Sequence, residues 1–266
     1  MRCNDIRVFD AVVNRASSEL IGDLDKLEMF LTEVSSQGNV HMVNTLFGLL
    51  DLYYDNNPHD EEFSSELWEA VNCAAENGHY DIVLLFANNT YGEGFWYSAA
   101  IVGASFGGHT DIVSRLINDY SQDTHDRCFR EALCEAAKYN HRDIVDIILE
   151  HIGYECSILI VTNAAAKYGY IDLLDDMLKI SHMDEDFCID DILQTAILSR
   201  SSNSRITVGK ILKFIEFSIE RTSNPEYLIE CLKQQLDQNL YGDEELSSVL
   251  LEQIRKVEPA YTHLYT

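Results

Sequence analysis

Three histidines are the side chains in this sequence whose type and spacing could most readily do chemistry: His79, His109 and His141. Imidazole is a common metal ligand and changes its charge near neutral pH. All three histidines, however, occupy the same place in a recurring phrase, two residues before an aspartate. Equivalent residues of stacked repeats lie about 10 Å apart, too far to converge on one ion. We therefore expect a structural role for them, at a turn.

A second candidate site is the acidic string Asp184-Glu185-Asp186 with Asp190-Asp191. Calcium prefers such oxygen ligands, but the string lacks the alternating ligands, central glycine and closing glutamate of an EF-hand loop. We interpret it as an exposed loop between repeats. No nucleophile elbow, phosphate-binding loop, dinucleotide-binding glycine motif or HExxH zinc motif is present. The sequence therefore predicts a protein that is not an enzyme and has no cofactor and no metal.

The histidines belong to a phrase that recurs about every thirty residues, the mark of a stacked-repeat protein. Each copy is too small to bury its own apolar face, so neighbouring copies must share a core. The copies read AAENGHYDIVLLF from Ala74, ASFGGHTDIVSRL from Ala104, AAKYNHRDIVDII from Ala136 and AAAKYGYIDLLDDM from Ala164, with a weaker VSSQGNVHMVNTL from Val34.

Within the phrase, two small residues are followed by a residue that tolerates the left-handed conformation ending a helix. An aspartate then falls where a second helix would begin, and apolar residues at i, i+1 and i+4 mark one face of that helix. The unit predicted is helix, tight turn, helix, loop. The turn residues are Gly38, Gly78, Gly108, Asn140 and Gly169; the aspartates are Asp81, Asp111, Asp143 and Asp172.

The run from Cys73 to Val83 resembles the core of an ankyrin repeat, as do Gly108-His109 with Asp111-Ile112-Val113 and His141 with Asp143-Ile144-Val145. The resemblance covers roughly residues 29 to 217. Because their period is short, these repeats are similar to the ankyrin repeats of large DNA viruses and protists. It implies an all-α solenoid of about 5–6 helix-turn-helix repeats with helical caps at both ends. It also implies that protein partners bind to the loops and the concave helix face.

The sequence departs from the ankyrin pattern at the start of the first helix, where the T-P-L-H motif is missing. Glu69-Ala70-Val71-Asn72 stands there in one copy. This removes a threonine cap and a histidine that normally ties adjacent repeats together. Periods below thirty-three also imply shortened loops, so we expect little regular strand.

We predict three regions in one elongated domain without an internal linker. Residues 1–28 form an N-terminal cap, with a helix at about 5–15. Residues 29–218 form the repeats, including a sixth copy from Asp191 whose second helix starts at Ile206. Residues 219–266 form a C-terminal helical cap, in which Pro225 suits a first helical position.

The net charge of −26 argues against nucleic acid or an anionic membrane as a partner, because both require a basic surface. It favours rapid encounter with a basic protein. Seven scattered cysteines without a CxxC pair indicate reduced thiols. There is no apolar run of membrane-spanning length and no secretory signal. We expect a cytoplasmic monomer, in the host cytoplasm if the source is viral.

Aromatic residues are frequent anchors of protein interfaces, and the loop before the third copy is rich in them. We predict partner-binding residues there and in the preceding long loop. The alternative is that Phe95, Trp96 and Tyr97 start the next helix and pack on the preceding repeat. The predicted contact residues are Tyr91, Phe95, Trp96 and Tyr97, with Tyr53 and Tyr54 from the preceding loop.

The leading functional hypothesis is a non-catalytic ankyrin-repeat scaffold that presents an extended acidic surface to a protein partner. An alternative is a substrate adaptor that recruits a ubiquitin ligase through its C-terminal helical segment. Viral ankyrin proteins often end in a short F-box-like segment, and Pro225 to Leu232 is the candidate here, although the usual Leu-Pro opening is replaced by Asn224-Pro225. An enzyme or metalloprotein is a third hypothesis, which native mass spectrometry for a bound cofactor would test.

Overall fold

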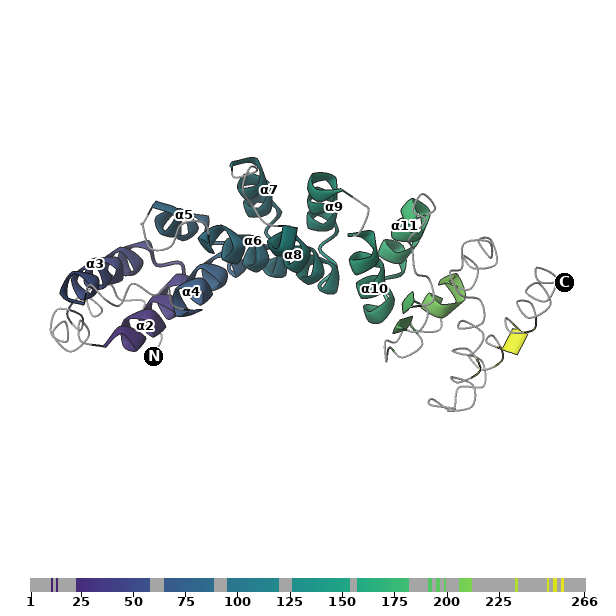
Figure 1. Ribbon diagram of the computed structural model, residues 1–266, viewed down its shortest axis with the longest axis horizontal. Helices are drawn as coiled ribbons and strands as arrows, with labels where there is room; N and C mark the ends of the chain where they lie inside the picture. Colours follow the sequence, from purple (N-terminus) through teal and green to yellow (C-terminus); the bar gives the residue numbers. More distant parts are fainter. Residues whose placement is uncertain are drawn as a thin grey trace. The chain divides into compact units, whose positions relative to one another are not determined.

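A computed structural model describes most of the first two thirds of the chain and a few residues beyond. The described ranges are 23–57, 65–88, 95–119, 126–153, 157–181 and 206–211, with residues 11, 13, 191, 192, 195, 196, 199, 233, 248, 251, 252 and 255. Every regular element within these residues is an α-helix, as expected (Figure 1). The predicted C-terminal segment 225–232 and nearly all of the predicted helix 5–15 lie outside them.

The chain divides into two compact units, Met1–Ile152 and Gly153–Thr266, a division that the sequence analysis did not predict. The first unit contains four consecutive helical hairpins. Their first helices are α2 (Leu24–Ser36), α4 (Ser65–Glu76), α6 (Phe95–Gly107) and α8 (Asp126–Lys138). Their second helices are α3 (Val40–Asn56), α5 (Tyr80–Asn88), α7 (Thr110–Asp119) and α9 (Arg142–Ile152). Because α2 begins at Leu24, the first hairpin starts before the predicted boundary at residue 29.

The second unit contains the hairpin of α10 (Ile158–Tyr168) and α11 (Ile171–Ser181). Farther along this unit, Ile192 and Ala196 are helical and buried, and so are Val208 and Ile211. These residues belong to the predicted sixth copy, whose second helix was expected to start at Ile206.

The tight turns form as the sequence predicts, because each turn residue has a positive φ angle. The values are 75° at Gly38, 80° at Gly78, 79° at Gly108, 60° at Asn140 and 74° at Gly169. The left-handed residue lets the following backbone N–H reach back five residues and satisfy a carbonyl at the end of the first helix. One such bond joins the His79 nitrogen to the Ala74 oxygen at 2.9 Å.

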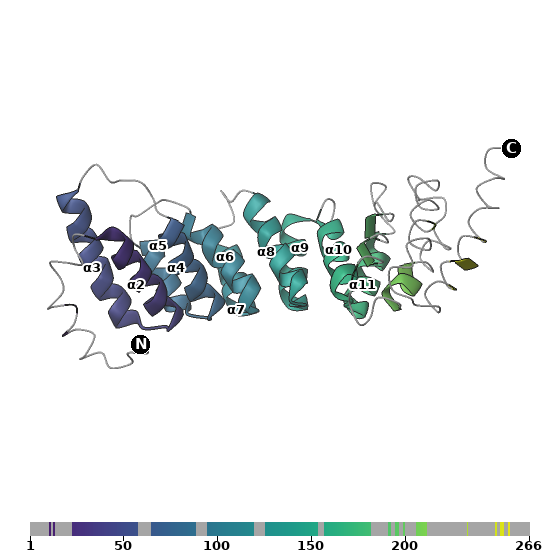
Figure 2. The same ribbon diagram turned by 90° about the horizontal axis from the view of Figure 1, so that it is seen from below.

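In the first unit, the first helices pack side by side: α2 lies against α4, α4 against α6, and α6 against α8 (Figures 1 and 2). Each also packs against its own second helix. The predicted small residues of the first helices are buried in the four copies from Ala74 onward, as are the predicted apolar faces of their second helices. Edge-to-face packing of Phe47 on Phe86, with ring centroids 4.9 Å apart, joins α3 to α5.

The contact between α4 and α6 is especially close because α6 carries two glycines on that side. A Cβ added at Gly103 would collide with the Asn72 carbonyl, and one at Gly107 would collide with the Glu76 carbonyl. The Asn72 side-chain amide also donates a hydrogen bond to the Ala99 carbonyl, at 3.3 Å. Small residues thus allow two helix backbones to approach each other.

Candidate protein-interaction surface

The three histidines of the repeat connect neighbouring hairpins in the first unit. The Nε2 atom of His79 lies 3.2 Å from the Ser36 carbonyl oxygen. His109 reaches the Glu76 carbonyl at 2.8 Å, and His141 reaches the Phe106 carbonyl at 3.0 Å. A carbonyl only accepts, so each Nε2–H donates. Each bond satisfies an orphan carbonyl at the end of the preceding first helix.

Each of these imidazole rings also lies against the turn glycine of the preceding hairpin. A Cβ at Gly38 would be 2.5 Å from the Cε1 atom of His79. A Cβ added at Gly78 would be 2.8 Å from the Cε1 atom of His109, and one added at Gly108 would be 2.7 Å from the Cε1 atom of His141. The glycines are therefore required for two reasons, the positive φ angle and the room for a ring. This geometry gives the histidines a structural task.

No metal site is found in the part of the chain that the structure describes, where no group of three or more His, Cys, Asp or Glu side chains could hold an ion. The acidic string from Asp184 to Asp190 lies outside the described residues. Among the described helices, none combines the length and apolar character needed to cross a membrane.

The expectation that Trp96 and Tyr97 lie on the surface is corrected, because both side chains are buried, with exposed fractions of 7% and 2%. Helix α6 begins at Phe95, so the two rings lie in its first turn. The Tyr97 ring packs 6.3 Å from that of Phe129 on α8. Tyr91 lies outside the described residues, as does the side chain of Phe95. The alternative considered for this loop is right that the two residues start the next helix, but the ring that Tyr97 contacts belongs to the following hairpin and not to the preceding repeat.

The expectation that Tyr53 and Tyr54 lie in a loop is also corrected, because α3 continues through both of them. Both side chains are partly exposed, and their rings meet edge to face with centroids 5.5 Å apart. Nothing before Pro58 interrupts the helix, since a proline disfavours the helical conformation only at the residue before it. These two tyrosines remain candidate contact residues, now on a helix.

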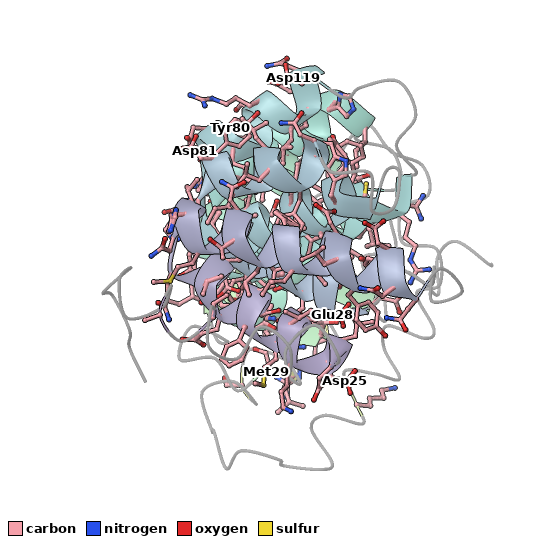
Figure 3. The ribbon with its side chains drawn as sticks, turned by 90° about the vertical axis from the view of Figure 1, so that its left-hand side faces the viewer. Asp25, Glu28, Met29, Tyr80, Asp81 and Asp119 are labelled. Atoms are coloured by element: carbon pink, nitrogen blue, oxygen red, sulfur yellow. The ribbon has the colours of Figure 1, made fainter. Side chains whose placement is uncertain are left out.

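Charge is distributed unevenly along the first unit. Between Lys26 and Arg115 the sequence has no lysine or arginine, whereas it has 13 aspartates and glutamates. We call residues 27–114 the cation-free segment. It contains α3, α4, α5, α6 and nearly all of α2. Seen along the row of helices, Asp25, next to the segment, lies on the first-helix side, and Asp81 lies on the second-helix side (Figure 3). Carboxylates thus occur on both sides of the row.

The negative charge of this segment also affects the thiol of Cys73 on α4. Burial is the main cause that raises the pKa of its thiol to about 12, and the carboxylates of Glu69 and Glu76 contribute to the same increase. The Sγ–H group donates to Glu69 Oε1 at 3.5 Å. A negative neighbour disfavours a thiolate, so the solvent-facing edge of α4 is unfavourable for anions and favourable for cations.

Sequence reasoning missed a cluster of aromatic and basic residues at the turns of the third and fourth hairpins. The Phe106 and Tyr139 rings lie 4.6 Å apart, and the Lys138 ammonium lies 4.9 Å from the Tyr139 ring. Arg115 similarly lies over the Tyr80 ring at 5.1 Å. Lys138-Tyr139 recurs as Lys167-Tyr168, whose ammonium lies 5.5 Å from its ring, but the sequence did not indicate that Tyr139 would contact Phe106 of the preceding hairpin. Beyond the cation-free segment, Arg115 and Lys138 thus contact aromatic rings of the same chain.

No protein-family model, curated protein or solved structure matches the chain significantly.

Proposed function

We propose that this chain is a non-catalytic scaffold of ankyrin-like repeats that binds a basic protein partner. The proposed architecture is a solenoid of about 5–6 repeats with helical caps. The equivalent turns at Gly38, Gly78 and Gly108 support it, since each joins the two helices of its hairpin and the second helix begins two residues later. The histidine bonds between hairpins also support it. In this proposal His79, His109 and His141 connect adjacent repeats, the role that the histidine of the missing T-P-L-H motif normally has.

The observation that carries the functional proposal is the cation-free segment. Thirteen carboxylates without a lysine or arginine over residues 27–114 produce a negative field that internal ion pairs with Lys or Arg of the same segment cannot reduce. Such a field speeds encounter with a positively charged protein and disfavours an acidic one. A row of packed helices presents this charge rigidly, which reduces the entropy lost on binding. We infer a cytoplasmic, monomeric protein without catalytic activity.

A pair of matched charge-reversal variants tests this function. Glu33→Lys with Glu69→Lys changes two exposed carboxylates inside the cation-free segment. Asp143→Lys with Glu150→Lys makes the same change in charge on α9, at two exposed positions outside it. Quantitative cross-linking mass spectrometry in the native cell should show loss of the partner from the first variant and its retention by the second. Added salt should weaken the wild-type complex.

Equal losses from the two variants would mean that net charge alone matters and would contradict a localised surface. Retention of the partner by both would exclude these carboxylates. The ligase-adaptor alternative depends on Pro225 to Leu232, which lie outside the described residues, and no observation on the described part favours it.

A further inference from the structure

Helix α3 is longer at its C-terminal end than α9, the second helix of the fourth hairpin. It ends at residue 56, 18 residues after the turn at Gly38. Helix α9 ends only 12 residues after Asn140, and Gly153, which follows it, is not helical. The six additional residues relative to α9 lengthen α3 by about 9 Å. We call residues 51–56 the α3 overhang.

The α3 overhang displays apolar and aromatic surface. Leu52 has an exposed fraction of 46%, among the highest of the large apolar side chains described. Tyr53 and Tyr54 follow it, partly exposed and in edge-to-face contact. After α9 the chain has left the helix at this register, because Gly153 is not helical. Exposed aromatic and aliphatic side chains on one short element are typical of contact surfaces.

The end of the overhang is held in helical form by two asparagines. The side-chain amide of Asn56 donates to the Leu52 carbonyl at 2.6 Å. That of Asn57 donates to the Tyr53 carbonyl at 2.9 Å. The Asn57 backbone N–H also donates to the Tyr53 carbonyl, at 2.9 Å, so backbone and side-chain donors together close the last turn and hold the backbone that carries the tyrosines. A surface ordered in advance loses less entropy on binding.

The electrostatics of this end favour a cation. The last turn of α3 contains no basic residue, and Asp55 lies there, exposed. The C-terminus of a helix carries a partial negative charge that favours cations and disfavours carboxylates. The overhang also lies within the cation-free segment, where no lysine or arginine is near in sequence. A lysine or arginine from another molecule would compensate both the carboxylate and the helix end.

We propose that the α3 overhang is the docking site for a lysine- or arginine-rich segment of the protein partner. A guanidinium or ammonium group binds the Asp55 carboxylate and the faces of the tyrosine rings, which attract cations. An apolar side chain beside it packs on Leu52. This inference rests on the proposed function and adds to it the place of contact and the chemistry of the bound segment.

A nona-arginine peptide serves as the probe, followed by calorimetry and by amide chemical shifts of the full chain. The largest shifts should map to residues 51–56. Asp55→Asn should weaken binding by about threefold to tenfold, the effect of one lost charge contact. Tyr54→Leu should weaken it similarly, because the ring is lost and the apolar volume is retained.

Asp119→Asn is the matched control, because Asp119 is an exposed carboxylate at the end of α7, whose last turn also lacks a basic residue. It should leave the affinity unchanged within about 1.5-fold, since a distant exposed charge is screened. Equal weakening by Asp55→Asn and Asp119→Asn would overturn the site. So would shifts centred on Glu69 and Glu76 of α4, a result that retains the proposed function. Absence of nona-arginine binding to the wild-type chain would overturn both.

Discussion

At the scale of single residues, the pairing of an imidazole with a glycine of the preceding hairpin accounts for two features of the repeat. His109 donates to the Glu76 carbonyl, and its ring occupies the space where Gly78 has no side chain. The glycine thus serves the backbone conformation and the packing at once. The histidine uses its hydrogen-bond donor to satisfy a carbonyl at a helix end, which is a structural role.

Gly78→Ala should therefore be strongly destabilising. The alanine must adopt a positive φ angle, and its Cβ displaces the His109 ring, so we expect a loss of roughly 2 to 4 kcal/mol in the free energy of unfolding. Gly48→Ala is the control: Gly48 is exposed in α3, and nothing lies within 4 Å of its added Cβ. It should stabilise by about 0.5 to 1 kcal/mol. Urea unfolding of both variants measures the difference, and equal effects would contradict the role of Gly78.

The thiol of Cys73 makes a second prediction at this scale. Because its pKa is raised to about 12, the thiol stays protonated at pH 8 and should react with iodoacetamide roughly tenfold or more slowly than in the unfolded chain. Its rate should keep rising as the pH is increased above 9. Glu69→Gln should lower the pKa and accelerate the reaction, whereas Glu33→Gln on α2 should not. Site-resolved mass spectrometry follows the modification; equal rates in folded and unfolded chains would refute the prediction.

At the scale of elements, sequence predicted what is determined locally. The left-handed turns follow from residue type, since Gly and Asn tolerate a conformation that other residues resist. The buried faces follow from helical periodicity. The hydrogen bond of His79 was not predictable in detail, because its acceptor on Ser36 lies 43 residues away. Trp96 was misplaced because an aromatic residue beside a glycine loop suits a core and an interface equally.

The length of α3 shows a further limit. The repeat phrase fixes where a second helix begins, but its end depends on the residues that follow, which differ between copies. In the first copy no glycine or proline interrupts the chain between Leu49 and Asn57. The helix therefore continues and carries Tyr53 and Tyr54 with it. Candidate contact residues were thus recognisable by type, whereas the element presenting them was not.

The close contact between α4 and α6 predicts a specific sensitivity. Gly103→Ala should force the two helices apart, because the new Cβ meets the backbone carbonyl of Asn72, which has little freedom to move. We expect a cost of about 1 to 3 kcal/mol in the free energy of unfolding. Gly209→Ala is the control, a helical glycine with nothing within 4 Å of the added Cβ. Thermal melting of both variants measures this, and a neutral Gly103→Ala would show that the helices separate at no cost.

At the scale of the whole molecule, charge and fold are determined by different residues. The stacking residues of the first unit are mostly apolar, small or histidine, and most of the described carboxylates lie at exposed positions, whereas Glu28 is buried. The sequence total of −26 indicated a basic partner without placing it. The order of residues along the sequence and the packing of the helices in a row together place this negative charge on the first three hairpins. The structure is needed to locate this charge, because an acidic residue can be solvated at any exposed position.

The bond between His109 and Glu76 has a consequence for how such a chain can grow. The second hairpin holds both a donor ring for the hairpin before it and an acceptor carbonyl for the one after it. A duplicated copy of the second hairpin would contain the donor and the acceptor needed to bond to both neighbouring hairpins, with no compensating change elsewhere. Deleting one such hairpin would likewise bring a matching donor and acceptor together. The number of hairpins can therefore vary in evolution by whole units while each junction stays the same.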